Sequence, residues 1–289
     1  MTMKQHILAA TLGTAVTALS SAANLSVLVS SGTGLSNFDT AVGVASRNDV
    51  SISGLASGDS LVGIDYRPAT GVTYGISSNS NIYTINTVTG AASQLGGTLS
   101  PTFNGSTFGF DYNPAFMGGQ FARVISNLDN NRVIDGNAGG YLGTVEKTAV
   151  FYAMGDPNAG VNPDINHIAY NNSVFGSTTT QQFGIDTDLD ILTTVANNAG
   201  TLATIGGLGV DASDLGGFDV DGASGRGFAA FQDVGGLTST IYEIDFGTGA
   251  ATSLFSFTGG AVGLTTVPEP SSTLLISLAG LGLIGRRKR

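Results

Sequence analysis

The stretch I-Y-T-I-N-T-V-T-G-A-A, residues 82–92, recurs as I-Y-E-I-D-F-G-T-G-A-A at residues 241–251. Both copies place alternating apolar side chains before a glycine-containing turn, which predicts a strand, a tight turn and a second strand. Shorter copies of the apolar–Asp core occur at Phe38-Asp39, Ile134-Asp135 and Ile185-Asp186. The five copies are spaced 47, 49, 51 and 59 residues apart, which is typical of a repeat architecture.

A second motif, Gly-apolar-Asp, precedes most of these copies. It occurs as Gly63-Ile64-Asp65, Gly109-Phe110-Asp111 and Gly217-Phe218-Asp219, with a degenerate version at His167-Ile168-Ala169. Between the two motifs we expect one more short strand, at residues 72–76, 122–126, 173–176 and 227–231. Units of about 50 residues with four short strands are typical of β-propeller blades. The sequence therefore predicts an all-β propeller of five blades, and the long last interval leaves six blades open.

The two ends of the repeat region complement each other. The first unit begins at residues 25–30 without a Gly-apolar-Asp strand, whereas Gly263-Leu264-Thr265 has no further repeat strands after it. A strand at residues 261–266 that pairs with residues 25–30 would complete the first blade. Such pairing removes the exposed strand edges of an open array. We therefore expect the ring to be closed by its N- and C-terminal strands.

The N-terminus has the three parts of a secretory signal peptide. Lys4 gives it a positive start, residues 7–19 are mostly apolar, and Ser21-Ala22-Ala23 provides small residues for cleavage. We expect a signal helix within residues 1–23, cleavage by signal peptidase after Ala23, and a folded domain over residues 24–266.

The C-terminus, residues 267–289, also has three parts. They are the motif Val267, Pro268, Glu269, Pro270, an apolar stretch over residues 271–285, and the basic tail Arg286, Arg287, Lys288, Arg289. This segment resembles the PEP-CTERM sorting signal of exported bacterial proteins. The resemblance implies cleavage by an exosortase, a transient stay at the inner membrane, and a final place at the cell surface or in the exopolysaccharide matrix of a Gram-negative-type bacterium. A helix of fifteen residues spans about 22 Å, short of a hydrocarbon core of about 30 Å; a permanent short anchor is the alternative.

The repeat region also resembles a known family. The segments L-V-G-I-D-Y-R-P-A-T-G-V-T-Y-G-I (residues 61–76), I-Y-T-I-N-T-V-T-G-A-A and F-G-F-D-Y-N-P (residues 108–114) are similar to the DUF4394 family, a domain of unknown function. The resemblance covers most of residues 25–265. It supports the fold and carries over no catalytic residue.

Composition narrows the classes of partner. Between the two targeting segments, six cations face 20 acids, a formal charge of −14. Such a surface disfavours nucleic acid and anionic lipid and leaves divalent cations open. The chain has no cysteine, so an exported domain must be held by its core without disulfides.

Catalytic residues are scarce in the same region. His167 is its only histidine, no G-x-S-x-G elbow occurs, and Glu146 and Glu243 are the only glutamates before the sorting motif. A serine triad needs a base beside a nucleophile, and a zinc site needs several His or Cys ligands. We therefore expect no catalytic residue and no cofactor, with calcium as the one cofactor left open.

Aspartates are the remaining candidates. Asp65, Asp111 and Asp219 occupy equivalent repeat positions, so their carboxylates could converge on one face of the ring; alternatively, each accepts backbone N–H bonds in the following turn. Two acidic clusters are candidate calcium ligands, because calcium takes six to eight oxygens. These clusters are Asp186, Asp188, Asp190 and Asp219, Asp221. Neither matches a complete calcium-binding loop, and exposed acidic turns are the alternative.

These features lead to two functional hypotheses. The first is an exported, non-enzymatic binding or scaffold propeller at the cell surface or in the matrix, with polysaccharide as a candidate partner. The alternative is an extracellular propeller enzyme, a polysaccharide hydrolase or lyase that uses Asp residues at the central mouth. The two differ in whether acidic side chains converge in one deep pocket or spread around the rim.

Overall fold

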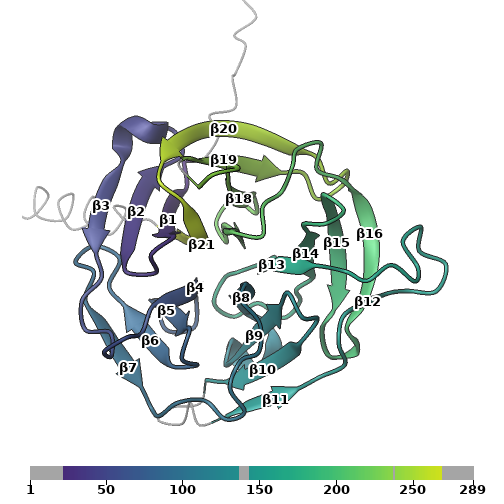
Figure 1. Cartoon of the computed structure of the whole chain (residues 1–289), viewed down its shortest axis with the longest axis horizontal. Helices are drawn as coiled ribbons and strands as arrows, with labels where there is room; N and C mark the ends of the chain where they lie inside the picture. Colours follow the sequence, from purple (N-terminus) through teal and green to yellow (C-terminus); the bar gives the residue numbers. More distant parts are fainter. Residues whose placement is uncertain (1–21, 137–142, 237, 269–289) are drawn as a thin grey trace, which may run out of the picture.

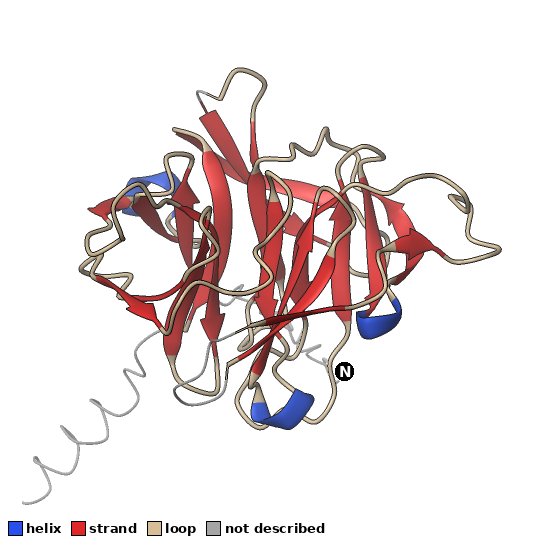
Figure 2. Cartoon of the chain, turned by 60° about the horizontal axis from the view of Figure 1, so that its bottom comes forward, coloured by secondary structure: helices blue, strands red, loops and turns tan. Residues whose placement is uncertain are grey.

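The computed structural model describes residues 22–136, 143–236 and 238–268. Their strands form five sheets around one axis, so the prediction of a five-bladed propeller is confirmed (Figure 1). Helical structure in these residues is confined to three 3-10 turns, η1 (Gly43–Ser46), η2 (Phe116–Gly118) and η3 (Asn197–Ala199) (Figure 2). None of the described helices is long and apolar enough to cross a membrane. Residues 1–21 of the expected signal peptide and 269–289 of the expected sorting tail lie outside the described residues.

We number the blades I to V in chain order and give their strands from the axis outward. Blade I contains β21 (Ala261–Val267), β1 (Asn24–Val29), β2 (Gly34–Asp39) and β3 (Asn48–Ser51). Blade II contains β4 (Leu61–Arg67), β5 (Val72–Ser77), β6 (Ile82–Ile85) and β7 (Ala92–Leu95). Blade III contains β8 (Phe108–Tyr112), β9 (Phe121–Ser126), β10 (Asn131–Asp135) and β11 (Thr144–Glu146). Blade IV contains β13 (Ile165–Tyr170), β14 (Gln182–Asp186), β15 (Ile191–Ala196), β16 (Thr201–Gly207) and β12 (Phe151–Tyr152). Blade V contains β17 (Gly216–Val220), β18 (Gly227–Gln232), β19 (Thr238–Ile244) and β20 (Ala251–Thr258).

Blade I is assembled from both ends of the domain. Strand β1 pairs antiparallel with β21, and Leu25 lies opposite Thr266. The predicted closure of the ring by its N- and C-terminal strands is therefore confirmed, and Figure 1 shows the yellow β21 beside the purple β1. Asn24 lies opposite Val267, so the first and last strand residues of the domain meet.

We call the end of the ring where the innermost strands begin the upper face, and the opposite end the lower face.

The hydrophobic core lies between neighbouring blades. Between blades IV and V, for example, Phe183 and Ile185 pack in one buried cluster with Phe218 and Val220. Alternate residues of a strand point to opposite faces of its sheet, so each blade contributes apolar side chains to two such layers.

Blade IV departs from the predicted strand pattern. Residues 173–176, expected as a strand, lie in the loop between β13 and β14. Ile185, expected in a third strand like Ile134, lies in β14, the second strand of its blade. The cause is a longer loop after β13, together with β12, which pairs parallel to β16 with Phe151 opposite Thr201. Second and third strands share the same alternation of side chains, so the local pattern could not distinguish them.

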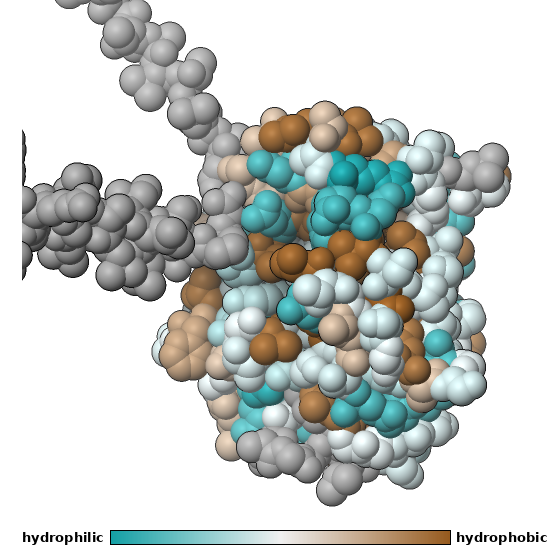
Figure 3. Space-filling view, turned by 90° about the vertical axis from the view of Figure 1, so that its left-hand side faces the viewer, coloured by the Kyte–Doolittle hydropathy of each residue, from teal (hydrophilic) through white to brown (hydrophobic). Residues whose placement is uncertain are grey.

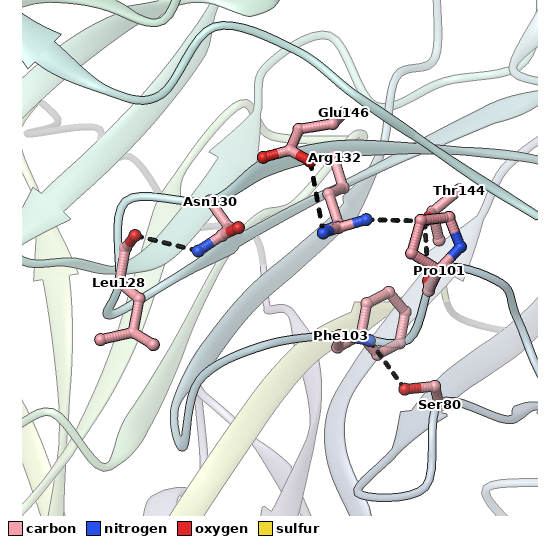
Figure 4. A network of polar contacts seen from close by, with 8 residues as sticks. All are labelled: Ser80, Pro101, Phe103, Leu128, Asn130, Arg132, Thr144 and Glu146. Carbon is pink, nitrogen blue, oxygen red and sulfur yellow. Dashed lines mark hydrogen bonds and ion pairs between the residues drawn. The ribbon is translucent and has the colours of Figure 1, made fainter.

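The outer rim is joined by polar contacts between loops. The Arg132 guanidinium donates to Thr144 Oγ1 at 3.1 Å, and Thr144 Oγ1 donates to the Pro101 carbonyl at 2.9 Å (Figure 4). Nearby, the Phe103 N–H donates to Ser80 Oγ. The bond from Thr144 ties the loop that follows blade II to the outer strand of blade III, and the bond from Phe103 ties the same loop back to blade II. Over blades I and II, hydrophilic and hydrophobic residues mix on the surface (Figure 3).

Candidate functional site

Glycines on the innermost strands let neighbouring blades approach closely. We call the contact between the innermost strands of successive blades a seam. A Cβ built on Gly217 would lie 2.1 Å from Leu264 N of blade I, and one on Gly109 would lie 2.8 Å from Ile168 N of blade IV. Gly63 and Gly263 also face the next blade, less tightly: a Cβ there would lie 3.1 Å from Phe110 Cβ and 3.4 Å from Ile64 N. The glycine of the repeat motif is therefore required by close backbone packing between blades.

Two residues after each glycine, an acceptor side chain binds a backbone N–H of the next blade. Asp65 Oδ2 accepts from Tyr112 N at 2.8 Å, Asp111 Oδ2 from Tyr170 N at 3.2 Å, and Asp219 Oδ2 from Thr266 N at 2.6 Å. In blade I, Thr265 Oγ1 takes this role and accepts from Tyr66 N at 2.8 Å. The aspartates accept backbone N–H bonds, as one of the two alternatives predicts. Except for Val220 N on Asp219, however, these donors belong to the adjacent blade and not to a following turn.

The same strands bring three carboxylates together on the axis. One oxygen from each of Asp65, Asp111 and Asp219 lies within 4.8 Å of the other two, and all three side chains are buried. Thr265 Oγ1 lies beside them, 3.1 Å from Asp219 Oδ2 and 3.4 Å from Asp65 Oδ1. Within the described residues, Asp111 Oδ1 is buried without a hydrogen-bond partner. The three carboxylates therefore converge, as one of the two alternatives predicts, but they do so buried inside the ring and not on one of its faces.

Burial and mutual repulsion dominate the electrostatics of this axial triad. Burial, followed by the charge of the neighbouring carboxylates, raises the pKa of Asp65 and Asp111 well above the ordinary value. Burial also raises the pKa of Asp219, to about 6, because its hydrogen bonds to Thr266 and Val220 only partly offset the loss of water. No lysine or arginine among the described residues is a cause of these shifts. The triad as it stands favours a proton or another cation.

The seam from blade IV to blade V is built differently. His167 stands where the other blades have glycine, and Ala169 stands where they have Asp or Thr. Ala169 belongs to the apolar cluster of this seam and cannot accept a hydrogen bond from the next blade. Val220 N of blade V donates instead to Asp219 Oδ1 of the same strand, at 2.6 Å. The His167 ring lies 5.7 Å from that of Phe231, and its Nε2 lies 2.8 Å from the Ser213 carbonyl. Burial lowers the pKa of His167 to about 4, so the ring is neutral at pH 7 and donates to that carbonyl. It is a packed core histidine.

A cleft of about 670 Å³ opens at the upper end of this unusual seam. The loop between β16 and β17 and the loop between β18 and β19 form most of its wall, and Thr187 of blade IV completes it. Three carboxylates, Asp211, Asp214 and Asp233, line it together with Gln232 and Tyr242, and the described lining contains no cationic side chain. Asp214 Oδ1 accepts from Thr187 Oγ1 at 2.8 Å, across the seam. The cleft therefore presents acceptors to a ligand.

Sequence reasoning missed these cleft residues. Asp211, Asp214 and Asp233 lie in loops outside both repeat motifs. The 59-residue interval between Ile185 and Ile244 is no signal for them, because Ile185 lies in the second strand of blade IV and Ile244 in the third strand of blade V.

The predicted calcium ligands do not form one group. Asp186 accepts from the Tyr152 hydroxyl and from Leu189 N, and Asp190 accepts from Ala212 N. Asp221 accepts from both the N–H and the hydroxyl of Ser224, while Asp188 is exposed. Of the five candidates, only Asp219 belongs to a carboxylate group compact enough for one ion, and its partners there are Asp65 and Asp111.

A smaller pocket of about 260 Å³ lies on the lower face between blades III and IV. It is lined by Phe116, Phe121, Arg123 and Lys147 among others. Its lining combines apolar and basic side chains, whereas the charged side chains of the upper cleft are all acidic. The two faces of the propeller therefore differ in the charge of ligand they would accept.

Comparisons with known proteins identify the family of the chain. A family model described as a domain of unknown function, DUF4394, matches residues 34–265, and one described as the PEP-CTERM protein-sorting motif matches residues 266–289. No curated protein sequence matches the chain. Similar solved structures include hydrazine synthase of Kuenenia stuttgartiensis (10% identity, TM-score 0.38, covering 69% of this chain and 49% of that one). Another is an auxiliary nutrient binding protein from Bacteroides ovatus (16% identity, TM-score 0.44, covering 68% and 50%). The matched region thus spans about half of each of these two structures.

Proposed function

The chain belongs to the DUF4394 family and ends in a PEP-CTERM sorting motif, which indicates exosortase-dependent export to the cell surface; from this premise we propose that it is a non-enzymatic glycan-binding propeller. Its ligand is a surface or matrix polysaccharide of neutral or amino-bearing sugars. The observation that carries the proposal is the upper cleft beside blade V, with three carboxylates and no cation in its described lining.

The chemistry of the cleft suits such a ligand. Sugar hydroxyls and ammonium groups are hydrogen-bond donors, and bonds to an ionised carboxylate are about twice as strong as neutral ones. Asp211, Asp214 and Asp233 are all exposed, so they reach a ligand without prior opening of the ring. The half-buried ring of Tyr242 adds an apolar surface, 5.4 Å from the Phe231 ring. Sugars that carry carboxylates would be repelled.

The axial triad counts against the enzymatic alternative. An enzyme at the central mouth needs carboxylates that reach the substrate. Asp65, Asp111 and Asp219 are at most 3% exposed. The void between the innermost strands above them measures only about 10 Å³, close to the size of one water molecule. A sugar ring cannot enter it.

Binding of the exported protein to a glycan array, followed by calorimetry on the best glycan, tests the proposal. Asp214→Asn removes a cleft charge and should weaken binding about tenfold. Glu146→Gln, which removes a similar exposed charge on blade III, is the matched control and should bind within twofold of the wild type. Binding of uronic-acid polymers only, equal binding by both variants, or release of new reducing ends from the glycan would contradict the proposal.

A further inference from the structure

The axial triad concentrates carboxyl groups where bulk solvent does not reach them. Asp65, Asp111 and Asp219 come from blades II, III and V, and one oxygen of each lies within 4.8 Å of the other two. Their described neighbours are backbone N–H groups and threonine hydroxyls. Three buried carboxylates repel one another strongly in a medium of low dielectric constant. A compact positive charge at their centre would turn this repulsion into attraction.

The spacing of the oxygens fits one ion. Calcium binds oxygens at 2.3–2.6 Å, so two ligands on opposite sides of it are about 5 Å apart. The observed limit of 4.8 Å places all three oxygens within that span. Most of the donors bind the Oδ2 atoms: Tyr112 N binds that of Asp65, Tyr170 N that of Asp111, and Thr266 N that of Asp219.

An unpartnered atom points independently to a ligand. Asp111 is 1% exposed, and within the described residues its Oδ1 has no hydrogen-bond partner. Buried polar atoms are nearly always paired in native proteins. Asp65 Oδ1 is little better served, because its hydrogen bond from Thr265 Oγ1 is long, at 3.4 Å. An ion between these two oxygens would satisfy both.

We propose that Asp65, Asp111 and Asp219 bind one calcium ion on the propeller axis. Three carboxylates supply three to six oxygens, depending on whether each binds through one atom or two. Thr265 Oγ1 is a further oxygen beside them. The void of about 10 Å³ lined by the residues just before these aspartates has room for about one water. Together these groups offer about five to eight oxygens, and they reach the six to eight ligands that calcium takes when at least one carboxylate binds through both oxygens. The ion joins blades II, III and V.

Metal analysis and melting of the purified exported protein test this site. As isolated in millimolar calcium, the protein should hold about one calcium per chain by mass spectrometry. Removal of calcium with a chelator should lower the Tm, and calcium addition should restore it. Failure to find calcium, together with a Tm that does not respond to it, would overturn the proposal.

The variant Asp111→Asn distinguishes the effect of calcium binding on stability from the effect of the hydrogen bond to Tyr170 N. The amide oxygen can still accept from Tyr170 N, but one charged ligand is lost. In chelator the Tm of this variant should equal or exceed that of the wild type, because repulsion among the axial carboxylates is reduced. In calcium its Tm should be lower than that of the wild type, and its calcium affinity should be at least tenfold weaker. Asp65→Asn should repeat this crossover if Asp111→Asn does not fold. Asp188→Asn, which changes an exposed acid of the loop 186–190, should leave calcium affinity unchanged. Loss of calcium binding in Asp188→Asn but not in the axial variants would place the ion elsewhere and refute the site.

Discussion

Four seams of this propeller share one construction, and the fifth does not. At the seams I to II, II to III, III to IV and V to I, a glycine lets the strands touch and an Asp or Thr binds the next backbone N–H. At the seam IV to V, His167 and Ala169 replace both residues, and apolar packing replaces the polar link. The large acidic cleft opens beside this one seam. The ring therefore tolerates loss of its repeat motif at this seam, beside the acidic cleft.

The strongest test of the common seam is Gly217→Ala. The new Cβ would lie 2.1 Å from Leu264 N, a backbone atom that cannot move without shifting β21. We expect a loss of about 3 kcal/mol or more in unfolding free energy, or a fall in Tm on the order of 10 °C. Chemical denaturation measures it. Gly207→Ala is the control, because its Cβ would meet nothing within 4 Å. Equal stability of the two variants would show that the seams are not closely packed.

The unusual seam should respond to pH through His167. Its pKa is about 6.5 unfolded and about 4 folded, so the unfolded chain takes up the proton first. The stability that this neutral ring confers is complete above pH 6.5 and is lost as pH falls toward 4, by about 3 kcal/mol in all.

His167→Gln keeps a donor for the Ser213 carbonyl but cannot titrate. Wild type and variant should therefore diverge between pH 6.5 and 4 in urea unfolding, with the wild type losing more stability. If the two curves of unfolding free energy against pH ran parallel over that range, protonation of His167 would not destabilise the protein, and the neutral ring would not be what stabilises this seam.

Restoring the repeat residue at the unusual seam should not help. Ala169→Asp puts a carboxyl into an apolar cluster, and the N–H it would bind, Val220 N, already donates to Asp219. We expect a loss of about 2 kcal/mol, measured by thermal unfolding at pH 7. Ala203→Asp on the exposed side of β16 is the control and should change stability by less than about 0.5 kcal/mol. A more stable Ala169→Asp would show that the fifth seam is merely a weakened copy of the others.

Much of the ring could be predicted from the repeat itself. The Gly-apolar-Asp strands and the I-Y-x-I copies mark the blades because close packing and half-burial impose their residues at fixed intervals. Closure of blade I followed from the strand missing at one end and present at the other. Blade IV was harder to assign, since His167-Ile168-Ala169 lacks both marker residues and a longer loop follows it.

The sites could be predicted only in part. Equivalent positions suggested that Asp65, Asp111 and Asp219 converge, but their N–H donors are supplied by the next blade, about 50 residues away in sequence. Asp211, Asp214 and Asp233 are brought together by loops, and no local periodicity marks a loop. The clusters at Asp186–Asp190 and Asp219–Asp221 looked alike in sequence, yet of their members only Asp219 belongs to a compact carboxylate group, together with Asp65 and Asp111.

The pairing of Asn24 with Val267 also sets an order of events during secretion. A chain that crosses a membrane from its N-terminus delivers β1 first and β21 last, so blade I waits with an open edge until the whole domain has emerged. The sorting motif begins at the residue where β21 ends. Closure of the ring and the first encounter with the sorting enzyme therefore involve the same few residues, so a chain that meets the enzyme before closure has its closing strand free beside the motif.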